Sequence, residues 1–373
     1  MAGARRRVVI DATPLLYRRT GIGRLTDMLI QTMSQMQLSF DVTLFGRRLL
    51  GPSLRDLSPA FKCRRVRLPR RAERFIENAR VVEMLCRGDL YHATDFYLPI
   101  RPGSANTLAT IHDTIFLAQP EAMVDHRRLA EWVPDFVRGC RRLIAPSAAT
   151  RLDIEKHLGF PRERIDVVHL GVERRLFHPG AGRERARDRL QTSLGLRRPF
   201  FLSVSCSTGR KNTTFLLRAY RSLLENQPAN DLVLVWDPPP EVRAEYSAME
   251  SSSRIHFVGR QPDDVLVDLY RAASALVFPS LYEGFGLPVL EAMACGAPVI
   301  VSKVSSLPEI AGEEALYIDP RDESTLVRAL ELCENEPERL ARMSRHGIAR
   351  SAQFSWERCA RETVAVYERC LSS

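Results

Sequence analysis

The stretch Ser280–Ile300 reads SLYEGFGLPVLEAMACGAPVI and holds two glutamates eight positions apart, Glu283 and Glu291, with a glycine turn between them. It follows the short apolar run Ala275–Phe278, which is typical of a buried strand. Pro288 is well suited to the first turn of a helix. The stretch therefore predicts a strand, a glycine turn and a helix, the unit from which parallel α/β sheets are built.

The same alternation of apolar runs and helical periodicity extends over most of the chain. It predicts strands at Arg7–Asp11, Phe40–Phe45, Cys63–Leu68, Leu90–His92, Thr107–Ile111, Leu143–Pro146, Ile165–His169, Phe200–Ser205, Leu232–Trp236, His256–Val258, Ala275–Phe278, Pro298–Val301 and Leu316–Ile318. It predicts helices at Arg24–Met36, Ala72–Leu85, His126–Arg138, Ala149–Leu158, Thr213–Leu224, Val265–Ala273, Pro288–Ala294 and Glu323–Cys333. This pattern indicates an open parallel sheet with helices on both faces, formed twice.

The alternation is interrupted once, at Val172–Arg198, which has no strand character and which we interpret as a linker. We expect an α/β fold of two Rossmann-like, doubly wound domains that face each other across a cleft. Their ranges are 1–175 and 176–355, and residues 356–373 form a C-terminal helix that crosses back to the first domain. Ligands of such sheets bind beyond the carboxyl ends of the strands, so functional residues should follow strands.

Composition and charge narrow the class of protein. The chain has 373 residues and a net charge of +9, and its first 178 residues carry an excess of 11 positive charges. Basic runs such as Lys62–Arg67 favour anionic surfaces, although a solvated basic face without a partner is the alternative. No aromatic-interleaved RNA motif or helix-turn-helix pattern is present, so we expect no nucleic-acid partner.

Cysteine spacing and the absence of targeting segments indicate the cellular compartment in which the protein acts. The eight cysteines show no Cys-x-x-Cys pair, and the histidines form no metal-ligand cluster, so we expect buried thiols in a reducing compartment and no metal site. The N-terminus turns polar at Asp11 before a signal-peptide core forms, and no apolar run is long enough to span a membrane. We therefore expect a cytoplasmic protein.

The glycine turn and its two carboxylates indicate a ligand with both phosphate and hydroxyl groups. Glycines let the backbone approach a ligand, and the start of a helix attracts an anion. Glu291, one turn into the helix, would repel a phosphate and therefore suits neutral hydroxyls such as those of a ribose. Glu283 suits the hydroxyls of a sugar. The alternative is structural, with Glu283 capping the turn and Glu291 solvated.

Three further features follow predicted strands. Arg210 and Lys211 lie in the loop after Phe200–Ser205, where two adjacent cations suit a diphosphate, unless they are simply solvated. Gly21 and Gly23 form a glycine loop that enters a helix but lacks the third glycine of a dinucleotide fingerprint. His112 ends a strand, where a binding role and a role as a core histidine are both open.

Together these features resemble one family, the retaining glycosyltransferases of GT-B architecture in family 4, and the resemblance covers nearly the whole chain. It rests on the glutamate pair in EGFGLPVLEAMACG, on GRKN at 209–212, on RRTGIGR near the N-terminus and on the pair His112-Asp113. APSAATRLDI, VVHLGVERRLF and FSWERCARETVAVYERC follow in the family's order. The RTGIGR segment most resembles bacterial mannosyl- and rhamnosyltransferases of surface polysaccharide synthesis.

The resemblance implies a role for each candidate residue. Glu291 would hold the nucleotide ribose and Glu283 the donor sugar, while Arg210 and Lys211 neutralise the departing diphosphate. His112 would contact the sugar near its reacting face. The remaining donor-binding positions that the resemblance implies are Gly21 and Gly23 over the phosphates, Val258 and Gly259 near the base, and the backbone at Phe285, Gly286 and Leu287. The first domain would bind the acceptor and the second the nucleotide sugar.

The reaction that the resemblance implies is a retaining, metal-independent hexosyl transfer. The absence of Asp-x-Asp among the nineteen aspartates argues against a metal-bound donor. We expect a nucleotide-sugar donor, with GDP-mannose as the best choice, no cofactor, and a glycan or polyprenyl-linked glycan acceptor of O-antigen type. The basic first domain would place the enzyme at the inner face of the plasma membrane. The alternatives are a soluble sugar acceptor, a sugar-nucleotide 2-epimerase and a catalytically silent partner subunit.

Overall fold

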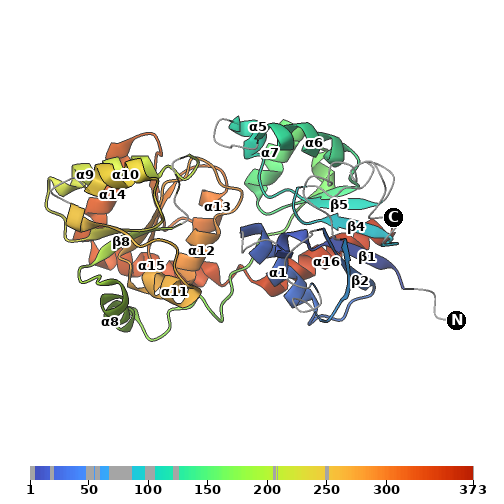
Figure 1. Ribbon diagram of the computed structural model, residues 1–373, viewed down its shortest axis with the longest axis horizontal. Coiled ribbons are helices and arrows are strands. Elements are labelled where there is room, and N and C mark those ends of the chain that lie inside the picture. The colour runs from blue at the N-terminus through green and yellow to red at the C-terminus, as the bar shows by residue number, and fades with distance from the viewer. Residues whose placement is uncertain are drawn as a thin grey trace. The chain divides into compact units, whose positions relative to one another are not determined.

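The computed structural model describes residues 5–16, 21–47, 54, 59–66, 86–96, 106–120, 126–204, 207, 209–247 and 252–372. The chain forms two compact units (Figure 1). Unit 1 comprises Met1–Gly171 together with Trp356–Ser373, and unit 2 comprises Val172–Ser355. The chain leaves unit 1 after Gly171, where the sequence led us to expect a boundary at 175, and it returns at Trp356.

Unit 1 is organised around a parallel sheet with the strand order β3-β2-β1-β4-β5-β6-β7. The strands are β1 (Arg7–Asp11), β2 (Asp41–Arg47), β3 (Lys62–Val66), β4 (Leu90–Ala93), β5 (Thr107–Thr110), β6 (Arg142–Ala145) and β7 (Ile165–Val167). The order reverses between β1 and β4, which pair directly, with Val8 opposite Leu90. This is the switch point at which ligands of open α/β sheets bind.

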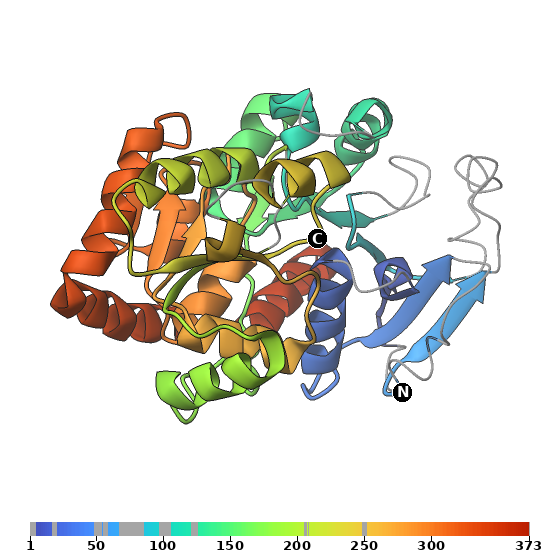
Figure 2. The same cartoon turned by 60° about the vertical axis from the view of Figure 1, so that its left-hand side comes forward.

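Helices cover both faces of this sheet. They are α1 (Gly21–Met33), α5 (Ile115–Ala118), α6 (His126–Arg138), α7 (Ala148–Leu158) and α16 (Trp356–Ser372), with short 3-10 turns η1 (Thr13–Leu16) and η3 (Arg162–Arg164). Figure 1 shows α5, α6 and α7 on one side of β4 and β5, with α1 and α16 on the other. The C-terminal helix packs beside α1 (Figure 2).

A buried polar chain anchors α16 to the sheet of unit 1. The Nδ1 atom of His92 in β4 lies 2.6 Å from the Tyr367 hydroxyl, and its Nε2 atom lies 2.8 Å from the Thr110 hydroxyl. His92 is fully buried, and burial, with a smaller contribution from His112, lowers its pKa to about 3. The ring is therefore neutral at physiological pH and has a partner for each nitrogen.

Unit 2 repeats the architecture with the strand order β10-β9-β8-β11-β12-β13. The strands are β8 (Phe200–Val204), β9 (Asp231–Val235), β10 (Ile255–Phe257), β11 (Ala275–Phe278), β12 (Val299–Ser302) and β13 (Leu316–Ile318). All are parallel, and the order reverses between β8 and β11. The carboxyl ends of these strands consequently meet at one edge of the sheet.

The helices of unit 2 again lie on both faces. They are α8 (Arg183–Leu194), α9 (Thr213–Leu224), α10 (Pro240–Ser247), α11 (Asp263–Ala272), α12 (Leu287–Ala294), α13 (Leu307–Ala311), α14 (Glu323–Asn335) and α15 (Pro337–Ser351), with a 3-10 turn η4 (Ser252–Arg254). Figure 1 shows α9, α10 and α14 on one side of β8, and α8, α11 and α15 on the other. Buried aromatic and aliphatic side chains from β8, β9, α9 and α14 form the core on the first face.

The fold class predicted from the sequence is confirmed, since the predicted strands lie within two residues of the observed ones over the described residues. The linker interpretation of Val172–Arg198 is wrong in part, because this range contains α8, which packs on α11 and buries Ala186 and Leu190. The predicted helix Ala72–Leu85 lies outside the described residues.

The expectation of buried thiols holds for most of the described cysteines. Six are buried, whereas Cys63 in the edge strand β3 is half-buried, and Cys206 lies outside the described residues. Burial raises the pKa of Cys86 to about 11 and that of Cys295 to about 12. These thiols are consequently protonated at neutral pH and poor nucleophiles.

Candidate functional site

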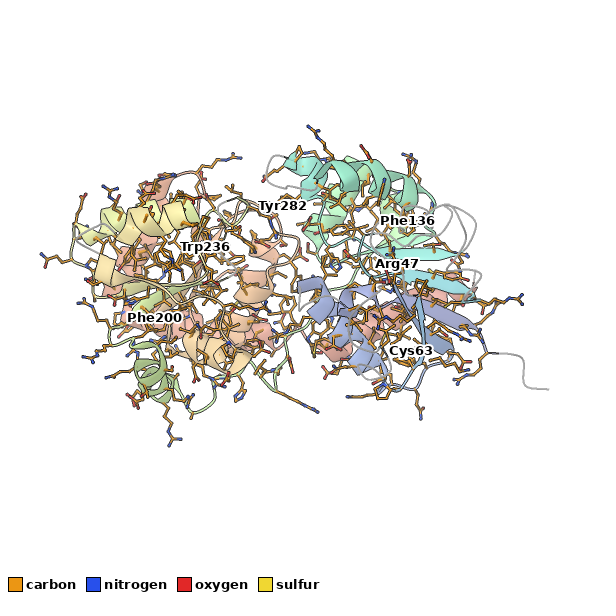
Figure 3. All side chains as sticks on the ribbon, in the orientation of Figure 1. Arg47, Cys63, Phe136, Phe200, Trp236 and Tyr282 are labelled. Carbon is orange, nitrogen blue, oxygen red and sulfur yellow. The ribbon has the colours of Figure 1, made fainter. Side chains whose placement is uncertain are left out.

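The candidate site of unit 2 lies at the carboxyl edge of its sheet. Figure 3 labels Phe200 at the amino end of β8, and Trp236 and Tyr282 just beyond the carboxyl ends of β9 and β11. The loop after β8 carries Arg210 and Lys211, and the loop after β11 carries Glu283. Because β8 and β11 flank the switch point, the three charged side chains predicted from the sequence meet where a ligand should bind.

Glu283 is the centre of a buried charge cluster. Its Oε1 atom lies 2.7 Å from Lys211 Nζ, and its Oε2 atom lies 3.1 Å from Arg210 Nη1. The side chains of Glu283, Lys211 and Arg210 are 7%, 14% and 31% exposed. The alternatives in which these residues are solvated, or in which Glu283 only caps the turn, are therefore wrong.

The electrostatics of the cluster favour a charged carboxylate. Burial of Glu283 opposes ionisation, but the nearby cations Lys211 and Arg210 outweigh it, so the pKa of Glu283 lies below its usual range. Lys211 also lies over the ring of Phe278, with Nζ 4.6 Å from the ring centroid. The ammonium group is thus held by a carboxylate and an aromatic face, which fixes a flexible side chain in one place.

Backbone contacts fix the two charged loops against each other. The N–H of Leu281 donates to the Arg210 carbonyl at 2.9 Å. The side-chain amide of Asn212 donates to the carbonyls of Pro279 at 3.2 Å and Pro320 at 2.8 Å. Asn212 has a φ of 56°, a left-handed conformation that asparagine tolerates better than most residues. These hydrogen bonds hold the loop after β8 against the loop after β11.

The glycine turn after Glu283 is held by two serines that the sequence analysis did not single out. The Glu283 N–H donates to Ser305 Oγ at 2.9 Å. The Ser306 hydroxyl lies 2.8 Å from the Glu283 carbonyl and 2.9 Å from the Phe285 carbonyl. Both serines follow β12, so the position of Ser305 and Ser306 after a predicted strand was the signal that could have identified them.

Gly286 ends the turn and begins helix α12. Its φ of 103° is a conformation that L side chains rarely adopt, and a Cβ atom there would lie 2.9 Å from Leu307 Cδ2. Leu287 is the first residue of the helix, and Pro288 follows in its first turn. Phe285 is buried against Phe354, with 6.0 Å between the ring centroids. The turn therefore requires glycine and places backbone amides at a helix start, where an anion is favoured.

Glu291 lies on α12 and points into the protein rather than into solvent. It is 9% exposed, and its Oε2 atom accepts a hydrogen bond from the Tyr270 hydroxyl at 3.0 Å. Tyr270 comes from α11 and packs against Phe177. The solvated alternative for Glu291 is therefore wrong, and Tyr270 is a contact that only the three-dimensional structure reveals.

Val258 and Gly259, expected near the nucleotide base, follow β10 at the same edge. The Val258 N–H donates to the Leu234 carbonyl at 3.0 Å, which continues the pairing with β9. Gly259 has a φ of 65°, and a Cβ atom there would lie 2.8 Å from Asp237 Oδ1. Asp237 follows β9, so this carboxylate and the glycine backbone are immediate neighbours.

In unit 1, His112 lies at the carboxyl edge, two residues after β5. Its Nε2 atom lies 2.8 Å from the Thr94 carbonyl, which can only accept, so Nε2 carries the proton. Its buried Nδ1 atom has no hydrogen-bond partner among the described residues. The ring contacts Phe96 edge-on and lines a cavity of about 30 Å³. His112 therefore keeps one ring nitrogen available.

Several charged side chains that the sequence analysis did not identify lie close to the switch point of unit 1. Asp11 at the end of β1 is buried, and its Oδ2 atom lies 3.6 Å from Arg47 Nη2 at the end of β2. Asp95 follows β4, and burial raises its pKa, reinforced by Asp11 and opposed by His112 and Arg47. The sequence signal was Asp11 itself, which ends a predicted strand.

Gly21 and Gly23 do not form the predicted loop, because α1 begins at Gly21 and both lie in its first turn. The predicted helix start at Arg24 was late because glycine disfavours a helix interior. Gly23 is buried and Gly21 is exposed. Residues 17–20, which precede them, lie outside the described residues.

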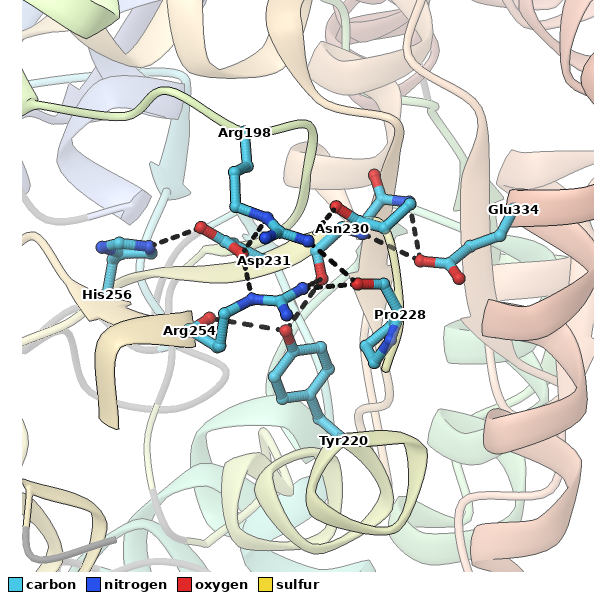
Figure 4. A network of polar contacts seen from close by, with 9 residues as sticks. Arg198, Tyr220, Pro228, Asn230, Asp231, Arg254, His256 and Glu334 are labelled. Atoms are coloured by element: carbon cyan, nitrogen blue, oxygen red, sulfur yellow. Dashed lines mark hydrogen bonds and ion pairs between the residues drawn. The ribbon is translucent and has the colours of Figure 1, made fainter. Parts of the chain in front are cut away.

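A second charged cluster lies at the opposite, amino edge of the unit 2 sheet (Figure 4). Asp231, the first residue of β9, accepts from Arg254 Nε at 2.5 Å and lies 2.9 Å from His256 Nε2 and 3.2 Å from Arg198 Nε. Burial opposes ionisation of Asp231, but hydrogen bonds from His256 and Arg254 prevail and lower its pKa. Because ligands bind at the carboxyl edge, we interpret this cluster as structural.

The described part of the chain holds neither a metal-binding cluster nor a helix that could span a membrane. No group of three or more histidine, cysteine, aspartate or glutamate side chains is arranged to hold a metal ion within that part of the chain. None of its helices is both long and apolar enough to cross a membrane.

Comparison with known families gives two matches in sequence along the chain. The profile described as Glycosyltransferase Family 4 matches residues 19–176. The profile described as Glycosyl transferases group 1 matches residues 184–350. Together they span most of both units, and the second includes the buried charge cluster.

Curated relatives include two proteins of Escherichia coli. The chain is 29% identical to O-antigen chain mannosyltransferase B over 97% of its own length and 99% of that protein. It is 30% identical to serotype-specific mannosyltransferase WbdA over 72% of its length but 34% of that protein. The chain therefore spans about a third of WbdA and nearly all of the other relative.

Among solved structures, sucrose-phosphate synthase from Thermosynechococcus elongatus matches with a TM-score of 0.75 at 20% identity. The match covers 99% of this chain and 100% of that one. At this level of identity the likeness concerns the fold alone.

Proposed function

Because the chain belongs to the family 4, group 1 glycosyltransferases of GT-B fold, we propose that it transfers mannose from GDP-mannose to a glycan or polyprenyl-linked glycan. The relative aligned over nearly its whole length is an O-antigen chain mannosyltransferase, which supports mannose and a role in surface polysaccharide synthesis. A transferase of this kind needs a donor site that stabilises a departing nucleoside diphosphate.

The observation that carries the proposal is the buried cluster of Lys211, Arg210 and Glu283 at the switch point of unit 2. When the diphosphate departs, negative charge builds on its oxygens, and two fixed cations beside the start of α12 stabilise it. Preorganised groups of this kind lower the barrier by about 3–4 kcal/mol for each donor. A catalytically silent partner subunit would have no need to keep this cluster.

The proposed donor site also gives roles to the other candidate residues. Glu291, held by Tyr270, accepts hydrogen bonds from the ribose hydroxyls, and the backbone from Phe285 to Leu287 contacts the donor phosphates and sugar. Glu283 keeps Arg210 and Lys211 in position and accepts from a hydroxyl of the sugar. His112, with Nδ1 available in unit 1, contacts the sugar.

The chemical step is a metal-independent transfer with retention of configuration. The bond between the anomeric carbon and the diphosphate oxygen breaks, and the acceptor oxygen bonds to the same face of that carbon. The acceptor's proton passes to a phosphate oxygen of the leaving group, so no protein nucleophile is needed. The cations therefore have most effect on the transition state, where the leaving group is most charged.

For a polyprenyl-linked acceptor we propose peripheral contact with an anionic membrane at its inner face. The edge strand β3 carries Lys62 and Arg64, which alternate onto one face and are both exposed. Such side chains attract anionic head groups by about 1 kcal/mol each near the surface. Replacing both with glutamate should abolish salt-sensitive sedimentation with anionic vesicles, whereas the same change at the exposed Arg185 and Arg197 of unit 2 should not.

The transfer itself is tested with purified protein, GDP-mannose and a synthetic lipid-linked glycan. The expected product gains one hexose by mass spectrometry, and nuclear magnetic resonance shows the α-anomer. Lys211→Ala should lower kcat/KM by about 10²–10³-fold. Product formed only on soluble sugars would favour a soluble acceptor, and epimerised donor without acceptor would favour a 2-epimerase. Neither transfer nor epimerisation, with no nucleotide bound, would contradict the donor site.

A further inference from the structure

Asp237 is a carboxylate at the ligand-binding edge of unit 2 that no role described so far uses. It lies two residues after the end of β9, and it is exposed. It has no hydrogen bond or ion pair within the described part of the chain. The neighbouring Trp236 packs into the core, 6.2 Å from the Phe257 ring centroid. Because successive side chains of an extended segment alternate, Asp237 points away from that core.

The sequence after Asp237 removes the usual structural explanation for such a residue. Aspartates after strands commonly accept from the backbone N–H groups of the next residues, as caps or Asx turns. Here those residues are Pro238, Pro239 and Pro240, none of which has an N–H. Three prolines also restrict the backbone, and a residue before proline is held extended. The carboxylate is therefore held on a stiff segment without a local partner.

Gly259 places this carboxylate against the backbone that follows β10. A Cβ at Gly259 would lie 2.8 Å from Asp237 Oδ1 and 3.5 Å from its Cγ. Neighbouring parallel strands lie about 4.8 Å apart, so β10 is about 10 Å from β8 and the cations that follow it. Glu291, where the proposed ribose binds, accepts from Tyr270 of α11, the helix that follows β10 and Gly259. We therefore place the base of the donor beside the loop after β10, next to Asp237.

We propose that Asp237 selects the base of the donor by accepting hydrogen bonds from the N1–H and the 2-amino group of guanine. This inference rests on the proposed donor site. A carboxylate is an acceptor only, with two oxygens side by side. Guanine has two adjacent donors on its Watson–Crick edge. Uracil and thymine have one N–H between two carbonyls, and adenine and cytosine have an amino group beside a ring-nitrogen lone pair. Each of these bases would therefore place a hydrogen-bond acceptor next to one carboxylate oxygen, which is unfavourable.

The expected discrimination is moderate because Asp237 is exposed. A good bidentate contact to a base corresponds to about 10–100-fold in affinity. Inosine diphosphate lacks the 2-amino group and should bind about 10-fold more weakly than GDP, since one charge-assisted hydrogen bond is lost. Uridine diphosphate should bind more weakly still.

The test is calorimetric titration of the full chain with GDP, inosine diphosphate, xanthosine diphosphate and UDP. Asp237→Asn changes the side chain to one acceptor beside one donor, which matches N1–H and the 2-carbonyl of xanthine. We expect wild type to prefer GDP and Asp237→Asn to prefer xanthosine diphosphate, an inversion that a structural role could not produce. Asp188→Asn, at an exposed position on α8, is the matched control and should behave as wild type.

Each other outcome overturns the inference in a distinguishable way. GDP preference that persists in Asp237→Asn would show that another group reads the base. A wild-type preference for UDP would refute guanine selection while the glycosyltransferase assignment stands. Failure of wild type to bind any of the four diphosphates would overturn the donor site and this inference together.

Discussion

The ion pair between Lys211 and Glu283 should affect the stability of the protein and its catalytic rate in different ways, and substitutions of the two residues can measure both effects. Lys211→Met leaves Glu283 buried with Arg210 as its remaining partner at 3.1 Å. Breaking a buried pair by removing one partner costs about 3–5 kcal/mol, and the second cation places this case near 3 kcal/mol. In a domain of about 150–250 residues, each kcal/mol lowers Tm by about 2–4 °C, so we expect a fall of about 6–12 °C.

A double-mutant cycle tests the assignment. In the Lys211→Met background, Glu283→Gln should cost about 1.5–3 kcal/mol less than it does alone, because no ammonium is left unpaired. Both single variants and the double variant should lose about 10²–10³-fold in kcat/KM, because removing both charges limits the loss of stability but does not replace the cation at the diphosphate. Urea unfolding and initial rates measure the two effects. Additive changes in unfolding free energy would refute the pairing.

The pH dependence of the same variant follows from the lowered pKa of Glu283. A carboxyl group with a depressed pKa in the folded state stabilises the protein above its unfolded pKa, about 4.3 for glutamate. This stabilisation is lost as the pH falls through the folded-state value. The contribution of Glu283 ionisation to wild-type stability should therefore be complete at neutral pH and decline below about pH 4.3, so the stability difference between wild type and Lys211→Met should be smaller in acid than at neutral pH. A constant difference down to acid pH would contradict the lowered pKa.

Four further predictions concern the scaffold. Asp231→Ala should lower the unfolding free energy by about 3–5 kcal/mol but leave nucleotide affinity unchanged, as urea unfolding and calorimetry would show. Tyr367→Phe should cost about 1–3 kcal/mol by leaving His92 without one partner. Because the pKa of His92 is lowered to about 3, wild-type stability should also fall as the pH drops from about 6.5 toward 3, measured by thermal unfolding. Gly286→Ala should lower Tm more than Gly195→Ala, since only the former meets a neighbouring side chain.

The strands and the place of the site were predictable because parallel strands have a simple local signal. Strands buried on both faces appear as short apolar runs, and their carboxyl ends must share one edge. This reasoning put Lys211 and Glu283, 72 positions apart in the chain, at the same place. Helix α8 was not predicted, because its sequence is rich in arginine and only two of its side chains, Ala186 and Leu190, are buried. Few apolar positions give little helical periodicity to detect.

Contacts between side chains from different elements could not be predicted in the same way. Tyr270 donates to Glu291 from another helix, and Asp237 lies against Gly259 from another strand. Neither pairing leaves a pattern within a short window of sequence, because it depends on how α11 and β10 pack. The sequence indicates which residues follow strands, and only the packed sheet indicates which of them meet.

The two charged clusters of unit 2 show why burial and pairing alone do not identify a functional site. Asp231 and Glu283 are both buried carboxylates, each paired with two basic groups or more, and each has a lowered pKa. Asp231 lies at the amino edge, where its partners also bond to backbone carbonyls and complete a closed network (Figure 4). Glu283 lies at the carboxyl edge, beside a glycine turn and the start of α12. Position relative to strand direction therefore distinguishes a group that holds the fold from one poised for a ligand.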